Sequence, residues 1–304
     1  MNKIENVIKK CYANSNVFQD IVIILKIVVY TVYAFFEVIF RNLVPSVYLN
    51  KNIKGDVVCI TGAAGGLGKE LAKNFLKLGC LVVCIDLSEE TLKNLETELT
   101  AMFAREPDSI RNRMYFYKLD ISKLNDIKSV CAQIKKEVGK VDILVNNAGI
   151  MNGSKSLLNL NDDEIVQIFN VNALSQIWLC REFLPEMISS KKGHIVNVSS
   201  ICGMAGGYKL SDYCTSKFAV NGFTESLRVE LSVLSPKNHI KVTLVCPFRI
   251  KTKMFNGADI NHLQWLELNL EPARVAEEIV NGVLLNKDLI LIPKINYLFT
   301  IIKS

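Results

Sequence analysis

The stretch Val57–Gly68, VVCITGAAGGLG, decides the fold of this chain. Its first residues are apolar and mostly β-branched, which favours a buried strand, and a glycine-rich turn follows them directly. A helical pattern of apolar residues begins near Leu67. A buried strand, a glycine-rich turn and a helix in this order are how a dinucleotide-binding βαβ unit begins.

Each glycine of the turn has its own expected role. Gly62 allows the tight turn out of the strand, Gly66 allows a pyrophosphate to approach the backbone, and Gly68 allows the helix to pack against the strand. The pyrophosphate is expected at the helix N-terminus beside Leu67, where free N–H groups and the helix dipole stabilise negative charge. A glycine triplet alone is equally well explained as an ordinary turn, so this interpretation depends on the residues downstream.

The composition indicates a folded chain with one large domain and an appendage, or with two small domains. Of its 304 residues, 50% are hydrophobic, and the net charge is +6. This mild, evenly spread charge weakly favours an anionic membrane surface and does not indicate binding to nucleic acid. The nine cysteines are irregularly spaced without a C-x-x-C pair, so we expect reduced core thiols rather than disulfides, and we predict no metal site.

The N-terminal part is expected to hold a membrane anchor. The apolar segment Val17–Phe40 is long enough to cross a bilayer as a helix, although it contains Lys26 and Glu37. A core helix of the catalytic domain is the alternative, but the nucleotide-binding unit begins anew after this segment and needs no such helix. We therefore divide the chain into an N-terminal segment, residues 1–50, and a single Rossmann-type catalytic domain, residues 51–304. Basic residues are balanced on the two sides of the segment, so its orientation is not predicted.

Strand and helix patterns alternate at short spacing after the glycine-rich turn. This alternation predicts an α/β fold with a doubly wound parallel sheet of the Rossmann type and about seven strands. Ligands of such sheets bind beyond the carboxyl ends of the strands. Polar residues or glycines follow four successive predicted strands at this edge: Gly62, Asp86, Asp120 and Asn147.

Further elements are predicted from apolar periodicity. One helix is expected over Ile121–Val138 with Ser122 as its N-cap, and a long helix over Asp162–Met187. A substrate loop is expected near residues 253–270, followed by a helix that Pro272 opens and a last strand.

Asp86 indicates which nicotinamide cofactor is preferred. It lies 18 residues past Gly68, where a carboxylate meets the adenosine ribose. A carboxylate there accepts hydrogen bonds from the ribose hydroxyls and repels a 2′-phosphate, so we predict NAD(H) rather than NADP(H). Asp86 is also placed to favour the start of the following helix, but Ser88 can supply the cap, so the two interpretations are compatible.

The chemistry is expected at Ser200, Tyr213 and Lys217. Ser200 follows the predicted strand His194–Val198, and Tyr213 and Lys217 lie four residues apart, on one face of a helix. A free tyrosine is a poor base because its pKa is about 10, and a neighbouring ammonium favours the phenolate. Tyr213 would then exchange a proton with a substrate alcohol or carbonyl, while Ser200 holds the same oxygen. Taken alone, such a Tyr–Lys pair is usually a solvated helix face.

Together these motifs resemble the short-chain dehydrogenase/reductase family over roughly residues 54–255. The matching motifs occur in family order: Thr61–Gly68, Asp120-Ile121, Asn146–Gly149, Val171-Asn172, Ser200 and Tyr213–Lys217. The resemblance implies that Asn172 completes a catalytic tetrad by holding a water that links Lys217 to solvent, although the nearby Asn170 remains an alternative. It further implies cofactor contacts from Asp120, Ile121, Asn147, Ala148, Gly149, Tyr213 and Lys217.

One departure from the family pattern follows the predicted strand Val242–Cys246. The family usually has Pro-Gly here, then a threonine that contacts the nicotinamide carboxamide. Pro247 and Thr252 fit this pattern and are expected to contact the cofactor, but Phe248 replaces the glycine. We expect Phe248 to shape the nicotinamide side of the pocket.

Three features make the resemblance to one branch of the family more specific: the C-P-F-x-I-K-T run, the D-Y-C-x-S-K-F helix start and the N-terminal apolar segment. They are similar to the membrane-associated branch with epidermal retinol dehydrogenases and lipid-droplet 17-beta-hydroxysteroid dehydrogenases. This implies an NAD-dependent alcohol dehydrogenase for a lipophilic alcohol or ketone, with retinol ahead of steroids. It also implies a homodimer on the endoplasmic reticulum membrane or lipid droplets, with the catalytic domain facing the cytosol.

A second hypothesis is a catalytically idle scaffold or nucleotide-sensing protein of the same fold on the same membranes. The presence of Ser200, Tyr213 and Lys217 together argues against it, because a scaffold needs none of them.

Overall fold

The computed structural model describes residues 49–103, 110–234, 239–255 and 269–294, and five single residues nearer the N-terminus. The chain divides into two compact units, residues 1–50 and 51–304. Most of the predicted anchor Val17–Phe40 lies outside the described residues. Five of its residues are described as helical and exposed: Ile24, Leu25, Val28, Val29 and Val32. Among the described residues, no helix is both long and apolar enough to cross a membrane.

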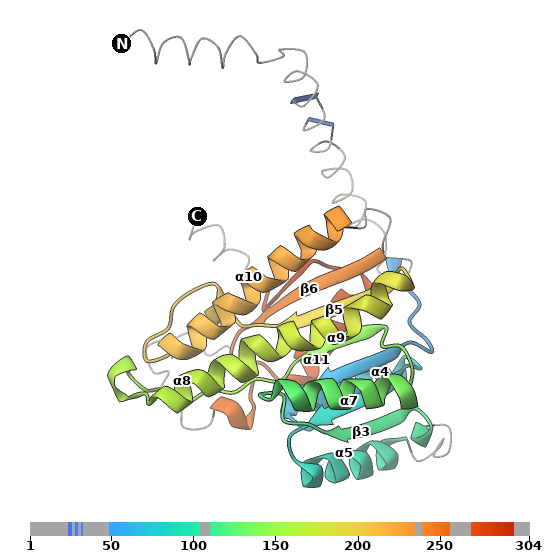
Figure 1. The fold of residues 1–304 in the computed structure, drawn as a ribbon, viewed down its shortest axis with the longest axis horizontal. Helices are drawn as coiled ribbons and strands as arrows, with labels where there is room; N and C mark the ends of the chain where they lie inside the picture. The colour runs from blue at the N-terminus through green and yellow to red at the C-terminus, as the bar shows by residue number, and fades with distance from the viewer. Residues whose placement is uncertain are drawn as a thin grey trace. The chain divides into compact units, whose positions relative to one another are not determined.

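The second unit is built on one sheet of seven parallel strands, in the order β3-β2-β1-β4-β5-β6-β7 (Figure 1). Its strands are β1 (Val57–Thr61), β2 (Leu81–Asp86), β3 (Met114–Lys118), β4 (Ile143–Asn146), β5 (Lys192–Val198), β6 (His239–Pro247) and β7 (Leu289–Ile292). The strand order reverses between β1 and β4, and a crevice at the carboxyl ends is expected at such a switch point. The prediction of a doubly wound parallel sheet is confirmed.

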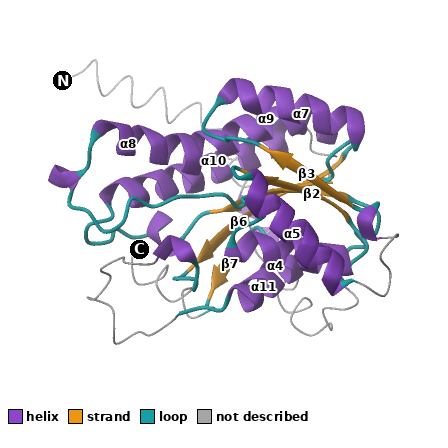
Figure 2. Ribbon diagram, turned by 90° about the horizontal axis from the view of Figure 1, so that it is seen from below, coloured by secondary structure: helices purple, strands orange, loops and turns teal. Residues whose placement is uncertain are grey.

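Helices cover both faces of the sheet, as the turned view in Figure 2 shows. One face carries α4 (Gly66–Lys77), α5 (Glu89–Met102) and α11 (Pro272–Leu284). The other carries α7 (Leu124–Glu137), α9 (Ser175–Ser189) and α10 (Ser211–Leu234). The described residues of this unit also form α8 (Asp162–Phe169), the π-helix η2 (Asn170–Leu174) and the 3₁₀ turns η1 (Leu157–Asn159), η3 (Ile201–Gly203) and η4 (Lys253–Phe255).

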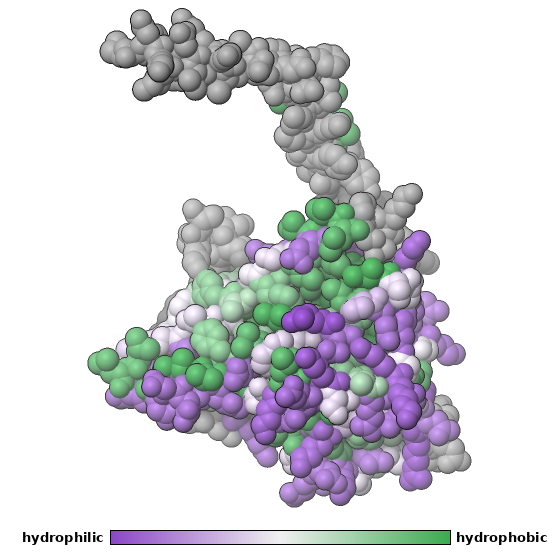
Figure 3. All heavy atoms as spheres, viewed as in Figure 1, coloured by the Kyte–Doolittle hydropathy of each residue, from purple (hydrophilic) through white to green (hydrophobic). Residues whose placement is uncertain are grey.

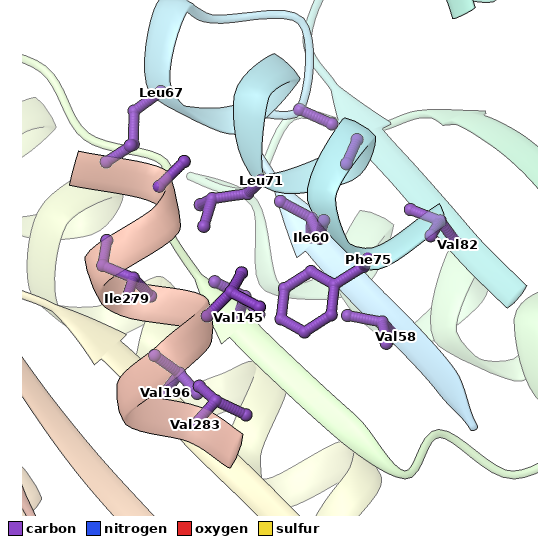
Figure 4. Packing of buried hydrophobic residues seen from close by; sticks show 14 of the residues in the cluster. Val58, Ile60, Leu67, Leu71, Phe75, Val82, Val145, Val196, Ile279 and Val283 are labelled. Carbon is purple, nitrogen blue, oxygen red and sulfur yellow. The ribbon is translucent and has the colours of Figure 1, made fainter. Parts of the chain in front are cut away.

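The core explains why the strands are apolar almost throughout. Phe75 of α4 and Ile279 of α11 converge on strand residues such as Val145 (Figure 4), and all three side chains are fully buried. Because helices cover both faces, each strand buries side chains on either side. Burying a large apolar side chain contributes about 1.5–3 kcal/mol, so this double layer holds the strand ends that form the site in fixed register.

Two helix predictions need correction. The helix predicted from Ile121 with a Ser122 cap begins instead at Leu124, without a side-chain cap. Ser122 donates its hydroxyl to Oδ1 of Asp120 at 2.6 Å, because the carboxylate at the strand end turns the chain first. The helix predicted over Asp162–Met187 is α8 and α9 joined by the π-helix η2.

Candidate active site

The glycine-rich turn has the geometry that its sequence predicts. Gly62 has a φ of 63°, which a side chain would strain, and α4 begins at Gly66. A Cβ on Gly68 would lie 2.1 Å from the carbonyl oxygen of Gly62, so only glycine allows the first turn of α4 to pack on the strand end.

The start of α4 can accept a phosphate. Its N-cap residue is Gly65, which has no side chain to cap the first-turn N–H groups. The backbone at Gly66 is bordered by the methyl group of Thr252, which a Cβ on Gly66 would approach to 3.0 Å. A bare helix N-terminus in a cradle of glycines fits the pyrophosphate of a dinucleotide. The side chain of Leu67 lies in the core, so only its backbone is available to a ligand.

Asp86 stands at the end of β2, directly beside this turn. Its Oδ2 accepts the N–H of Ala64 at 2.9 Å, and its Oδ1 accepts the N–H of Leu87 at 2.8 Å. The carboxylate therefore fixes the glycine-rich turn relative to β2. Ser88 caps α5 by accepting the N–H of Thr91, as predicted, so this helix does not need Asp86 as its cap.

The segment after β4 packs against the glycine-rich turn. Thr61 Oγ1 accepts the N–H groups of Asn147 and Ala148, both at 3.1 Å, and Asn147 Nδ2 donates to the carbonyl oxygen of Thr61 at 2.9 Å. The Cα of Ala148 lies within 2.9 Å of where a Cβ on Gly62 would be. Sequence reasoning assigned no role to Thr61, although it opens the glycine motif.

Gly149 connects this segment to the catalytic candidates. A Cβ placed on Gly149 would lie 3.3 Å from Asn172 Oδ1 and 3.4 Å from Lys217 Nζ. The glycine-rich turn therefore contacts the segment after β4, and this segment in turn lies beside Lys217.

Asn172 lies inside the π-helix η2 and is fully buried. Its Oδ1 accepts the N–H of Ile150 at 2.8 Å, and its Nδ2 donates to the carbonyl of Ile150 and to Ser216 Oγ, both at 3.0 Å. Its own carbonyl oxygen accepts Nε2 of Gln176 at 3.0 Å. π-Helical turns often mark functional sites. Sequence reasoning missed Ser216 and Gln176, because apolar periodicity does not reveal a π-turn.

Ser200, Tyr213 and Lys217 come together where β5 ends and α10 begins. Ser200 is the N-cap of η3, where its Oγ accepts the N–H of Cys202, and hydrogen bonding from its side chain acts to lower the pKa of the Tyr213 phenol. Lys217 Nζ lies 5.8 Å from the centre of the Tyr213 ring and donates to the carbonyl oxygen of Val198 at 3.1 Å. The neighbouring Ser199 donates instead to the backbone of Lys217. Ser200 is therefore the serine that meets the phenol.

The pKa shifts differ from the expectation that Lys217 acidifies Tyr213. Burial raises the pKa of Tyr213, whose side chain is only 4% exposed, and the hydrogen bond from Ser200 opposes that rise. Burial also lowers the pKa of Lys217 to about 8. Loss of solvation is therefore the largest influence on the pKa of both groups.

The strand end after β6 closes the site on the other side. Pro247 ends β6, and Thr252 borders Gly66 as described above. The ring of Phe248 packs against the core cluster of α4 and α11, and its N–H donates to the carbonyl of Ile292 at 2.7 Å. At least part of this ring therefore serves the core rather than the pocket.

The predicted site residues thus gather at the carboxyl edge of the sheet, with two qualifications. The side chain of Ile121 is buried in the core between the sheet and α7, so only its backbone is available to a ligand. Most of the predicted substrate loop, residues 256–268, lies outside the described residues. No cluster of potential metal ligands occurs among the residues that the structure describes.

Comparisons with known proteins agree with this architecture. The sequence profile of the short chain dehydrogenase family matches residues 56–262. Epidermal retinol dehydrogenase 2 of Homo sapiens is 42% identical over 84% of this chain and 79% of the relative. The 17-beta-hydroxysteroid dehydrogenase 13 of Homo sapiens is 33% identical over 89% of this chain and 85% of the relative.

Solved structures share the fold. A short chain dehydrogenase/reductase from Burkholderia phymatum in complex with NAD has a TM-score of 0.72 at 23% identity, covering 82% of this chain and 92% of that one. A short-chain dehydrogenase from Sphingobium yanoikuyae in complex with NADPH has a TM-score of 0.69 at 23% identity, with the same coverage.

Proposed function

Because this chain belongs to the short-chain dehydrogenase/reductase family, we propose that it is an NAD(H)-dependent oxidoreductase that interconverts a lipophilic alcohol and its carbonyl compound. Family membership supports the oxidoreductase class and a nicotinamide cofactor. The preference for NAD(H), the alcohol substrate and the membrane location are further steps of the proposal.

The observation that carries the proposal is the meeting of Ser200, Tyr213 and Lys217 at the ligand-binding edge of the sheet. A phenol in contact with a serine hydroxyl and one helical turn from an ammonium is suited to moving a proton at an alcohol oxygen. The glycine turn that fits a pyrophosphate is connected to this lysine through Gly149.

Each of the three residues has its own role in the proposed reaction. Ser200 holds the substrate oxygen, Tyr213 Oη takes the alcohol proton or returns it to a carbonyl, and Lys217 supplies positive charge near the phenol. When bound, the nicotinamide cofactor supplies the group that accepts or donates hydride. Gly62, Gly66 and Gly68 would hold its pyrophosphate and Asp86 its adenosine ribose, and Asn147, Gly149, Pro247 and Thr252 would border the rest of the cofactor.

A proton at Tyr213 also needs a route to solvent. Lys217 and Asn172 both border Gly149, and Asn172 is held rigidly by three side-chain hydrogen bonds. We assign Asn172, rather than Asn170, to this relay. Its carbonyl oxygen accepts Nε2 of Gln176, and we propose that the same polar cluster holds the water of the relay.

The substrate class follows from two observations. The relatives are named for retinol and for hydroxysteroids, which are both lipophilic alcohols. Apolar side chains also gather on the surface around η1 and α8 (Figure 3), where Leu158 is 94% exposed and Leu157 and Val166 are also exposed. This surface follows the segment that carries Gly149, so an apolar substrate would find a compatible surface near the site. We place retinol ahead of steroids.

The location rests on the sequence of the N-terminal segment. Its apolar stretch Val17–Phe40 would attach the protein to the endoplasmic reticulum membrane or to lipid droplets, where lipophilic alcohols accumulate. We propose a homodimer with the catalytic domain facing the cytosol.

A substrate panel tests the function. The full chain in membranes is given all-trans-retinol, a 17β-hydroxysteroid or a long-chain aliphatic alcohol with NAD or NADP, and absorbance at 340 nm is followed. We expect turnover of at least one lipophilic alcohol with NAD. Binding of NADH without turnover of any alcohol, or of the matching carbonyl compounds, would favour the idle nucleotide-sensing protein instead.

Removing the charge of Asp86 is expected to weaken the preference for NAD. Like charges placed together cost several kcal/mol, so Asp86→Asn should raise the ratio of kcat/KM for NADP to that for NAD by about tenfold or more. Asp86→Ala should do the same and also weaken NAD binding, because the N–H of Ala64 loses its acceptor. Steady-state kinetics with both cofactors measures this ratio.

The control for this experiment is Asp288→Asn, which removes an exposed carboxylate just before β7, at the amino ends of the strands and away from the predicted cofactor site. It should leave the cofactor ratio unchanged. An unchanged ratio in both Asp86 variants would refute the assignment of NAD(H).

A further inference from the structure

Two cysteine thiols lie beside the predicted catalytic residues. Cys202 is in η3, two residues past Ser200, and its N–H donates to Ser200 Oγ at 3.1 Å. Cys214 follows Tyr213 in the first turn of α10. Cys202 packs against the buried cluster that contains Cys214, and a hydrogen bond with Cys202 is the largest cause of the lowered pKa of Cys214. The two cysteines are therefore neighbours in the fold, although they lie 12 positions apart in the sequence.

The two thiols are largely buried, but one of them is partly exposed. Cys214 is 5% exposed and packs with Ile168, Leu210 and Tyr213, whereas Cys202 is half-buried and packs against this cluster from the outside. A small oxidant can therefore approach the pair from the side of Cys202.

Cys214 differs chemically from the other cysteines that the structure describes. The hydrogen bond from Cys202 lowers the pKa of Cys214, and a hydrogen bond from the backbone of Gly207 acts in the same direction against the effect of burial. The other seven described cysteines have raised pKa values, mainly through burial or, at Cys202, through donating to Cys214. The thiolate, which is the nucleophilic form, is therefore concentrated at Cys214.

We propose that Cys202 and Cys214 are a redox-sensitive dithiol that a peroxide converts to a disulfide, and that this bond switches off the adjacent site. The pairing of a nucleophilic thiol with a second thiol in contact, next to Ser200 and Tyr213, carries this inference.

The reaction balances with hydrogen peroxide as the oxidant. The sulfur of Cys214 attacks one peroxide oxygen, the O–O bond breaks, and the departing oxygen leaves as water with the thiol proton. The sulfur of Cys202 then attacks the Cys214 sulfenic acid, the S–O bond breaks, and a second water leaves with the Cys202 proton. The two thiols lose two electrons in total, and the peroxide gains them.

The disulfide would disturb the site through its geometry. A disulfide brings two sulfurs to about 2.05 Å, closer than any hydrogen-bonded contact, so the bond would draw η3 and the first turn of α10 toward each other. Ser200 accepts the N–H of Cys202, so we expect it to be displaced relative to Tyr213. Because a misplacement of about 1 Å can cost roughly 100-fold in rate, we expect an activity loss of at least about tenfold.

Peptide mapping tests the modification without any activity assay. The full chain, purified under reducing conditions, is treated with a few equivalents of hydrogen peroxide and digested without reductant. We expect a Cys202–Cys214 linked peptide that disappears after reduction with dithiothreitol. Cys59 and Cys131, which neighbour each other in the core, serve as the internal control and should stay reduced. Absence of the linked peptide, or linkage of other cysteines instead, would overturn the proposal.

Two variants test the switch, which rests on the proposed function. Cys202→Ser and Cys214→Ser each leave one thiol, and each is compared with its own untreated sample. We expect peroxide to lower the activity of the wild type at least about tenfold, reversibly, and to change either variant far less. A linked peptide with unchanged wild-type activity would overturn the switch but leave the modification site standing. Loss of activity in the variants equal to that in the wild type would also overturn the switch.

Discussion

Replacing Tyr213 by phenylalanine is expected to lower kcat by about two to four orders of magnitude, the range that a general acid–base group contributes. The substitution removes only the hydroxyl, so the ring still packs with Ile168 and Cys214, and the fold should persist. Ser200 would still hold the substrate oxygen, but no group would exchange its proton. Initial rates at saturating cofactor and substrate measure this loss.

The matched control is Tyr115→Phe, which removes a phenol from β3 at the far edge of the sheet. Its kcat should equal that of the wild type. NADH binding, followed by fluorescence, should change far less in Tyr213→Phe than kcat does. If Tyr213→Phe turned over lipophilic alcohols at the wild-type rate, the proposed mechanism would be wrong.

The fold could be predicted from the sequence because its signals are local and repeated. Each strand is a short apolar run that ends at a turn, as in Leu81–Asp86, and each helix has its own apolar stripe. In a parallel sheet all carboxyl ends meet at one edge, so the position of Asp86 or Asn147 in the sequence already places it at the site. No long-range information was needed to bring these residues together.

The hydrogen-bond details at the site could not be predicted in the same way. The π-helix around Asn172 has the same apolar residues that an α-helix would have, so its shifted hydrogen bonds leave no mark on periodicity. Ser122 is a good N-cap residue, but the neighbouring Asp120 competes for its hydroxyl. The contact between Cys202 and Cys214 depends on how η3 meets α10, which no local pattern records.

The pKa of Tyr213 shows a different limit. The spacing of Tyr213 and Lys217 correctly placed an ammonium near the phenol, but not how deeply both are buried. In a closed site, loss of hydration shifts both groups toward their neutral forms. Proximity can be derived from helical spacing, whereas desolvation depends on the whole surrounding fold.

Replacing Gly68 by alanine is expected to weaken NADH binding at least about tenfold, the equivalent of about 1.4 kcal/mol, and to lower the free energy of unfolding by about 1–3 kcal/mol. The added Cβ would lie 2.1 Å from the carbonyl oxygen of Gly62 and 2.8 Å from the Cα of Ala63. Both neighbours are backbone atoms, so the clash can be relieved only by moving α4 away from β1. The N–H groups that are to hold the pyrophosphate would move with the helix. Fluorescence titration with NADH and chemical denaturation measure the two effects.

Gly222→Ala is the matched control, because it adds the same methyl group to a helix where no atom beyond the helix's own nearby backbone lies within 4 Å. Glycine costs a helix interior roughly 0.5–1 kcal/mol relative to alanine, so this variant should be slightly more stable than the wild type and bind NADH equally well. Comparing the two variants distinguishes the effect of replacing a glycine in a helix from the effect of disrupting the close packing at the glycine-rich turn. If Gly68→Ala bound NADH as tightly as Gly222→Ala, the pyrophosphate would not lie at the start of α4, and the cofactor site would have to be sought elsewhere along the sheet edge.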